Sequence, residues 1–412
     1  MIDRAHIEHW ADMQPTKGDF PQLIRRLVYA SVTPYLIKAN IPYGSAVFMG
    51  GWDGEVETSQ QTEYMPLGKS ILEFGTDGIY KRKAEGDYAK RSAEVYEGLN
   101  KAETTFIFMT PRVWGDKREW EEEKKKEGIW KDVRVYDSTV LAQWIISVPS
   151  VELWFASLLG IQSPNLVTGE ERLEELLTGG NIKLKPSFYT AGREEVAMKL
   201  KGMLGSPTLR AFRASSKEEA IGFILAAGKL FPQKEQDEFY SKTIVLEDKS
   251  AFRQMKAQTS MINLVPDFED ATVLYSAASQ GKIVLVPLGP GDDFNQHVED
   301  LPSPDRFALE KSLIESGVEE ERAGRIVKDC SCNLTMIKKE LGFPILRVDW
   351  MNDDANEIVP ALIVERWNEN FDGDRELMAS LSEKDYESFQ SSMVQWSQKS
   401  VPPIMNRGAF GE

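Results

Sequence analysis

Acidic side chains gather in two neighbouring segments near the N-terminus. The segment GGWDGEVET (residues 51–59) contains Asp53 and Glu57, and the segment KSILEFGT (residues 69–76) contains Glu73. Carboxylates that converge on a divalent cation can activate water and stabilise charge on a phosphate, and a nearby lysine helps with both. The two segments supply carboxylates for such a site. The alternative for the first segment is a surface hairpin, because Asp-Gly is a common turn dipeptide.

Glu73 is unusual because it lies within an apolar strand pattern. Alternate residues of a strand share a face, so Ile71, Glu73 and Gly75 point one way while Leu72 and Phe74 point the other. A glutamate in such a setting is costly to bury unless it is paired or bound to a metal. The alternative is an edge strand on which this carboxylate faces water.

The elements that must position these residues alternate between helix and strand over the first 160 residues. The patterns predict helices at 20–31, 80–99 and 117–127, with strands at 45–51, 69–76 and 104–111. A further strand, KDVRVYDS, and a further helix, TVLAQWIIS, follow. This alternation predicts an α/β fold, a mixed α/β sandwich around a central sheet.

The order of helix, GGWDGEVET, SILEFGT, charged helix and TTFIFMTP resembles the PD-(D/E)xK restriction-endonuclease-like fold, near its Mrr-type branch. The resemblance covers about residues 15–160. It implies cleavage of double-stranded DNA that depends on Mg²⁺ or Mn²⁺, with Asp53 as the metal-binding aspartate and Glu73 at the first position of the (D/E)xK element. Glu57 is an alternative ligand. The sequence departs from the family at Gly75, where the pattern has a lysine.

A lysine from another element can replace the one that is missing. Gly75 leaves space on its face of the strand, and the helix that follows begins with basic residues at 81–83. We favour Lys83 as the catalytic lysine. The alternative is that Lys83, Asp87 and Arg91, spaced at i, i+4 and i+8, form salt bridges on a solvated helix face.

The net charge of −16 argues against nucleic-acid binding by the whole surface, which relies on Lys and Arg to neutralise phosphates. A local DNA site is compatible with this charge, since a nuclease site is itself acidic. The basic residues that we consider as contacts to DNA phosphates are Arg25, Arg26, Lys81, Lys90 and Arg91.

The central part of the chain predicts a second domain. Residues 161–190 have the Pro, Gly and polar content of a linker that contains one short helix. Residues 191–345 then alternate strands and helices, which indicates a parallel sheet, followed by helices. TLRAFRASSKEEAIGF has the strand, loop and helix order of a P-loop but lacks the glycines and the G-K-[ST] that bind phosphate. Lys217 is followed by two glutamates, so no nucleotide-binding residues are expected.

The helical tail of this region resembles the lid of AAA+ and STAND-type NTPases. The resemblance implies a degenerate STAND NTPase-like domain with a helical lid, which acts in assembly or regulation. Residues 346–412 are rich in tryptophan and largely helical, and they resemble the winged-helix part that follows such modules. The fold class as a whole is therefore α/β with a helical, winged-helix-like C-terminal part.

The composition predicts a cytoplasmic protein. No stretch approaches twenty consecutive apolar residues, the N-terminus lacks a secretory pattern, and the two cysteines, Cys330 and Cys332, are poorly spaced for a disulfide. By analogy, the chain is expected to be an anti-phage defence endonuclease under an inactive STAND-like domain, with a homo-oligomer or protein partner bound through the C-terminal domains. The alternatives are a non-catalytic scaffold with an inactivated nuclease-like domain, and an active NTPase switch.

Overall fold

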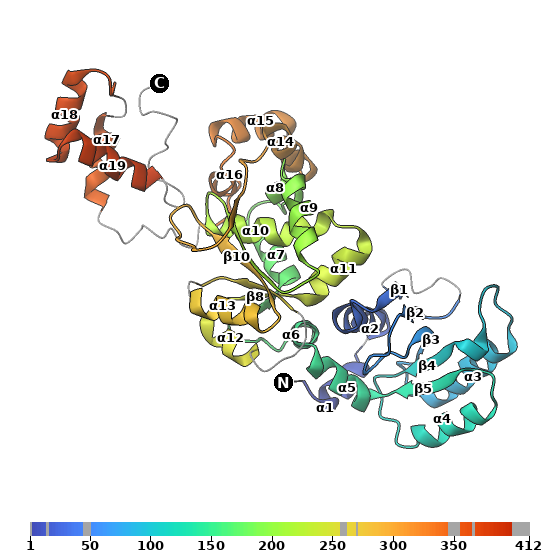
Figure 1. Ribbon diagram of the computed structural model, residues 1–412. Helices are drawn as coiled ribbons and strands as arrows, with labels where there is room; N and C mark the ends of the chain where they lie inside the picture. The colour runs from blue at the N-terminus through green and yellow to red at the C-terminus, as the bar shows by residue number, and fades with distance from the viewer. Residues whose placement is uncertain are drawn as a thin grey trace.

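The computed structural model is a mixed α/β structure with two separate sheets (Figure 1). It describes residues 2–13, 16–43, 51–255, 262–268, 271–344, 355–364 and 367–397. The predicted α/β class is confirmed. The strand predicted at 45–51 lies outside the described residues except for Gly51.

The first sheet has five strands in the order of the chain. The strands are β1 (Leu36–Asn40), β2 (Gly54–Thr58), β3 (Gly68–Phe74), β4 (Thr105–Met109) and β5 (Asp132–Tyr136). β1, β2 and β3 pair antiparallel, whereas β3, β4 and β5 pair parallel. β3 is therefore the central strand, and it has neighbours on both sides.

Helices cover both faces of this sheet. They are α1 (Arg4–Ala11), α2 (Thr16–Val32), α3 (Tyr80–Ala93), α4 (Lys117–Lys126), α5 (Ser138–Ser147) and α6 (Pro149–Leu158), with the 3₁₀ turn η2 (Lys101–Glu103) before β4. Leu72 and Phe74 pack in the core made with α1, α2, α5 and α6, whereas Ile71 packs in the core made with α3. This alternation along β3 confirms the predicted division of its side chains between two faces.

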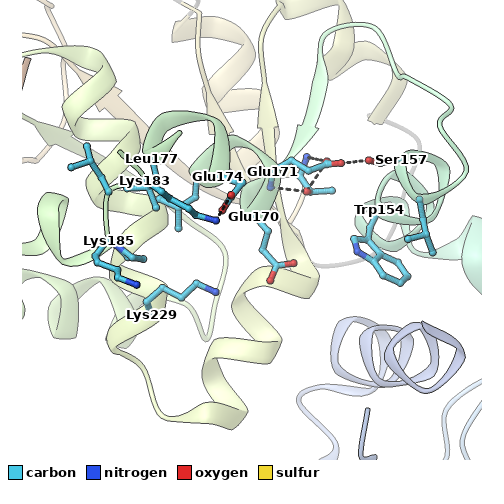
Figure 2. A pocket seen from close by; sticks show the side chains of 14 residues that line it. Trp154, Ser157, Glu170, Glu171, Glu174, Leu177, Lys183, Lys185 and Lys229 are labelled. Carbon is cyan, nitrogen blue, oxygen red and sulfur yellow. Dashed lines mark hydrogen bonds and ion pairs between the residues drawn. The ribbon is translucent and has the colours of Figure 1, made fainter. Parts of the chain in front are cut away.

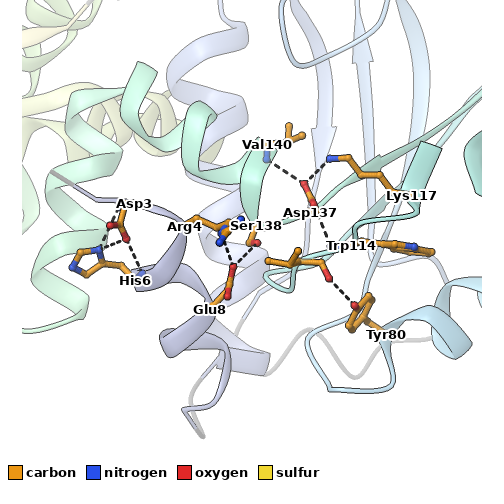
Figure 3. Close-up of polar contacts among 11 residues, drawn as sticks. Asp3, Arg4, His6, Glu8, Tyr80, Trp114, Lys117, Asp137, Ser138 and Val140 are labelled. Atoms are coloured by element: carbon orange, nitrogen blue, oxygen red, sulfur yellow. Dashed lines mark hydrogen bonds and ion pairs between the residues drawn. The ribbon is translucent and has the colours of Figure 1, made fainter. Parts of the chain in front are cut away.

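Asp137 joins the end of β5 to the surrounding helices (Figure 3). Its carboxylate caps α5 by accepting from the Val140 amide at 3.3 Å, and it also accepts from Lys117 at 2.6 Å and from the Trp114 amide at 3.2 Å. The side chain is buried, so these donors compensate for the water that it loses. The contacts fix α5 and the start of α4 at the same end of the sheet.

The second sheet has six strands in the order β11-β7-β10-β9-β8-β6. These are β6 (Leu166–Thr168), β7 (Thr208–Arg213), β8 (Thr243–Leu246), β9 (Asn263–Pro266), β10 (Ile283–Leu288) and β11 (Val298–Asp300). All adjacent pairs are parallel except β6 with β8, which is antiparallel. The second sheet is therefore mixed: β7 to β11 pair parallel, as predicted, and β6 adds an antiparallel edge strand.

Two groups of helices cover the faces of the second sheet. The larger group consists of α7 (Gly169–Leu177), α8 (Ser187–Thr190), α9 (Glu194–Met203), α10 (Lys217–Ala227), η3 (Gly228–Leu230), α11 (Gln233–Lys242), α14 (Arg306–Glu315), α15 (Glu320–Asp329) and α16 (Leu334–Glu340). The other face is covered by α12 (Lys249–Met255) and α13 (Ala271–Ser279). The predicted helical region after the sheet corresponds to α14, α15 and α16.

The segment predicted as a linker carries regular structure. β6 and α7 lie within residues 161–190, and α7 begins with a capping box in which Thr168 and Glu171 exchange hydrogen bonds. Because β6 pairs with β8, this segment forms the edge of the second sheet. Pro164 precedes β6 and Gly179 and Gly180 follow α7, whereas Gly169 is the first residue of α7.

The described part of residues 346–412 is helical. It consists of η4 (Ala355–Ile358), α17 (Val359–Val364), α18 (Asp372–Ser382) and α19 (Tyr386–Ser397), which share a small core of their own. The segment 362–389, on which the predicted winged-helix likeness rests, forms the end of α17, α18 and the start of α19, and its described residues include no strand.

Two arginines of α2 attach it to helices of the second sheet. Arg25 pairs with Asp237 of α11, and Arg26 pairs with Glu170 of α7 and stacks over Trp154 of α6 at 4.6 Å. Figure 1 shows α2 on the side of the first sheet that faces the second one, with α3 and α4 on the far side. These ion pairs therefore bridge the two α/β units.

In the described part of the chain, no single helix is long and apolar enough to cross a membrane. α5 and α6 reach that length only together, with a bend of 118° between them.

We predict that limited proteolysis cuts the chain between residues 160 and 165. This turn has no helix or strand and is largely exposed, whereas β6 and α7 directly after it are paired and packed. Mass spectrometry of the first fragments measures the cut site. Initial cleavage within α7 would contradict the assignment of this helix to the folded edge of the second sheet.

Candidate active site

Glu73 is buried in the centre of the first sheet and is paired with Arg91. Its residue is only 1% exposed, and its carboxylate accepts a hydrogen bond from Arg91 Nε at 2.5 Å. The alternative of an edge strand with Glu73 facing water is wrong, because β3 has β2 and β4 on its two sides. The carboxylate is thus held in a place where an unpaired charge would be very costly.

Arg91 also reaches the glycine-rich turn. Its guanidinium donates to the Gly51 carbonyl and, at 3.0 Å, to the Tyr96 hydroxyl. Arg91 was predicted as a phosphate contact or as part of a solvated salt-bridge face, and both predictions are wrong. The buried face of α3 consists of Ala84, Tyr88 and Arg91, spaced at i, i+4 and i+7. That spacing was the sequence signal that could have assigned Arg91 to the interior.

Asp53 lies next to Glu73 at the start of β2. β2 and β3 pair with Gly54 opposite Leu72, so Asp53 precedes the pairing at the end where Glu73 and Phe74 lie. The Asp53 carboxylate accepts the Phe74 amide at 2.7 Å. Burial raises the pKa of Glu73, the Asp53 charge adds to this, and Arg91 opposes it, which leaves the pKa at about 8. The two carboxylates therefore form an electrostatically coupled pair.

Lys83 lies within the field of both carboxylates. Burial lowers the pKa of Lys83, but the Asp87 carboxylate at 2.7 Å, together with the charges of Asp53 and Glu73, outweighs this and raises it. Of the predicted salt bridges among Lys83, Asp87 and Arg91, the one between Lys83 and Asp87 is confirmed. The Lys83 side chain nevertheless remains 38% exposed.

Phe108 explains the glycine at position 75. A Cβ atom built on Gly75 would lie 2.4 Å from the Phe108 ring. The prediction that Gly75 leaves open space is wrong, because this aromatic ring of β4 occupies it. A lysine at this position would require the ring to move, so the cationic side chain of the site has to come from α3.

Glu57 does not join the acidic pair. It lies four residues beyond Asp53 along β2, which corresponds to roughly 13 Å in an extended strand. Its opposite residue on β3 is Lys69, at the far end of the strand from Glu73. Its predicted role as an alternative metal ligand is therefore wrong for a cation bound at Asp53.

The predicted phosphate contacts divide into two groups. Arg25 and Arg26 are held by the ion pairs to Asp237 and Glu170, with little exposed side chain, so the structure gives them a bridging role in place of the predicted one. Lys81 and Lys90 are exposed on α3, and Lys81 pairs with Asp116 at 2.5 Å. These two lysines remain accessible to a phosphate backbone near Lys83.

The donor set at Asp53 and Glu73 suits Mg²⁺ in its chemistry. Mg²⁺ is commonly held by one or two carboxylates, together with water and substrate phosphates. Within the described ranges, no group of three or more His, Cys, Asp and Glu side chains forms a metal site. The fit thus rests on two carboxylates, of which Glu73 would have to exchange its contact with Arg91 for one with the cation.

The loop between β7 and α10 has no open phosphate cradle. Glu219 is buried and accepts hydrogen bonds from Arg193 at 2.5 Å and from Ser215. Lys217 lies 3.6 Å from Asp267, and Lys338 of α16 lies 2.5 Å from Glu218. These basic side chains near the loop are thus already paired with carboxylates of the protein, so they are not available to neutralise a bound phosphate.

Neither a scan against protein-family models nor a search of curated proteins finds a match to this chain.

We predict that at pH 9, above the Glu73 pKa of about 8, Arg91→Ala lowers the free energy of unfolding by about 3–5 kcal/mol, because it removes the partner of a buried, ionised carboxylate. Lys90→Ala is the matched control, and it should change the free energy by less than about 0.5 kcal/mol because Lys90 is exposed. Urea denaturation measures both. Equal stability of the two variants would show that the Glu73–Arg91 contact contributes little.

Proposed function

We propose that the N-terminal α/β unit is a Mg²⁺-dependent endonuclease that acts on double-stranded DNA. The observation that supports this best is the convergence of Asp53, Glu73 and Lys83 from three different elements. Two coupled carboxylates beside a lysine are the groups that metal-dependent phosphodiester hydrolysis requires. The resemblance of the surrounding elements to the PD-(D/E)xK fold agrees with this proposal.

Each residue has a separate task in this proposal. Asp53 and Glu73 hold the cation, which supplies the Lewis acidity that activates water and neutralises the phosphate. Lys83 stabilises the negative charge that develops on the scissile phosphate, at a point where Asp87 keeps its side chain oriented. Lys81 and Lys90 contact the flanking phosphates from the exposed face of α3.

We further propose that the second α/β unit is a regulatory or assembly module without nucleotide turnover, of degenerate STAND type. Its support is the internal pairing of Glu219 with Arg193 and of Glu218 with Lys338, which occupies the loop where a P-loop would bind phosphates. The chain would act in anti-phage defence, in the cytoplasm, as a homo-oligomer or with a protein partner. This part of the proposal rests on analogy of fold.

A specific observation favours a second candidate, a non-catalytic binding or scaffold protein. Arg91 pairs with Glu73, and Phe108 fills the side of Gly75, so the acidic pair is already compensated inside the protein. In this case the nuclease-like sheet would serve as a rigid platform. The cleavage experiment below separates the two candidates.

We predict that Asp53→Ala and Glu73→Ala each abolish Mg²⁺-dependent cleavage of plasmid DNA, because each removes a ligand of the cation. DNA binding should largely survive, since the phosphate contacts come from other residues. Gel analysis of plasmid nicking and a fluorescence binding assay measure the two effects. If the parent protein does not cut DNA with Mg²⁺ or Mn²⁺, the scaffold candidate is favoured.

We predict that Lys83→Ala slows cleavage by on the order of 10²-fold, as expected when one group that stabilises transition-state charge is deleted. Lys90→Ala, on the same helix, should slow it far less because Lys90 contacts only the flanking backbone. Single-turnover rates at saturating protein measure this difference. Equal rates for the two variants would exclude Lys83 as the catalytic lysine.

We predict that Mn²⁺ affinity rises with pH up to about pH 8 and then levels off. The pKa of Glu73 is raised to about 8, so below that pH a proton must leave before the cation binds, which weakens affinity by about tenfold per pH unit. Calorimetric titration between pH 6 and pH 9 measures the slope. Glu73→Gln should bind weakly with no such slope, and a flat profile in the parent would place the cation away from Glu73.

A further inference from the structure

A cavity of about 810 Å³ opens between α6, which packs on the first sheet, and α7 with the segment 183–186 of the second α/β unit (Figure 2). This volume lies in the range of small-molecule sites, on the order of 300–1,000 Å³. Much of its lining is apolar and comes from Trp154, Leu158, Leu173, Leu177, Leu184 and Pro186. It is separate from the acidic pair of the first sheet.

Lysines gather at one end of this cavity. Figure 2 shows Lys183, Lys185 and Lys229 at that end, with Trp154 and Ser157 at the other. Lys183 and Lys185 come from the segment before α8, and Lys229 comes from the turn η3. The cavity therefore has a cationic end and an aromatic end.

The glutamates that line the cavity are already engaged. Glu170 pairs with Arg26, and Glu174 pairs with Lys183. Glu171 accepts hydrogen bonds from Thr168, within the capping box of α7, and from Ser157. Their negative charges are thus held by other residues, with only one of the three lysines neutralised directly.

Lys185 and Lys229 have no such partner. Among the described residues, no carboxylate lies within ion-pair distance of either ammonium group. Lys229 instead lies over the Tyr240 ring at 4.1 Å. Burial lowers the pKa of Lys229 and the Arg26 charge adds to this, whereas the charges of Glu170, Asp237 and Glu174 act in the opposite direction. Both lysines retain exposed surface at this end of the cavity, so an anion placed there can accept hydrogen bonds from both ammonium groups.

We propose that this cavity binds a small organic phosphate, with its phosphoryl group between Lys185 and Lys229 and its apolar or aromatic body along the leucines toward Trp154. Two ammonium groups match the charge of one phosphomonoester, and each charge-assisted hydrogen bond is strong in a partly enclosed site. The apolar lining selects against small inorganic anions, because they would leave it in contact with water.

The test uses the full chain and adenosine monophosphate as the probe, since it combines one phosphomonoester with a flat ring. Calorimetry should detect binding of this probe and much weaker binding of inorganic phosphate. Lys185→Ala and Lys229→Ala should each weaken binding by about tenfold or more, the effect of one lost charged hydrogen bond. Lys217→Ala is the matched control, and it should leave the affinity unchanged because Lys217 lies outside the cavity.

Other outcomes would overturn the proposal. Absence of binding heat for the probe, or equal affinity in the two cavity variants and the parent, would exclude an organic-phosphate site here. Loss of binding in Lys217→Ala alone would move the site to the loop between β7 and α10. Equal affinity for inorganic phosphate and the probe would show that the apolar lining takes no part.

Discussion

The organisation of the first sheet depends on the burial of one carboxylate, Glu73, in its central strand. A charge at that position requires a cation that comes from outside the sheet, and Arg91 of α3 supplies it. Because Arg91 also binds the Gly51 carbonyl, a single guanidinium fixes α3 against both β3 and the glycine-rich turn. Lys83 lies two turns earlier on the same helix, where the charges of Asp53 and Glu73 help to raise its pKa.

Sequence patterns predicted those features that depend on neighbours along the chain. The alternation of Leu72 and Glu73 between faces follows from the strand period, and the Lys83–Asp87 pair follows from the helix period. The position of Phe108 could not be predicted, because it depends on the parallel register of β3 and β4, which places Glu73 opposite it. The partner of Glu73 was missed for a similar reason, since eighteen residues and a turn separate it from Arg91.

The second α/β unit also contains a buried glutamate that is paired with an arginine from another element. Glu219 and Arg193 form a buried ion pair at the start of α10, where the loop from β7 would otherwise expose amide groups to an anion. A sequence without the P-loop glycines already indicated a loop unsuited to phosphate. The location of the substitute charge could not be inferred, because Arg193 precedes β7 and reaches Glu219 only in the folded chain. The strand β6 within the predicted linker was missed on similar grounds, since three residues become a strand only by pairing with β8.

Arg26 joins the two α/β units and also contacts the lining of the cavity between α6 and α7. Its guanidinium stacks on Trp154 and pairs with Glu170, and both of these residues line the cavity, whereas its helix, α2, packs on the first sheet. A ligand in the cavity can shift the conformation of the first unit only if it binds two conformations of the Arg26 contact with different affinities. Arg26, which the sequence alone suggested as a DNA contact, is thus the residue whose guanidinium holds α2 of the first unit against two side chains of the cavity lining.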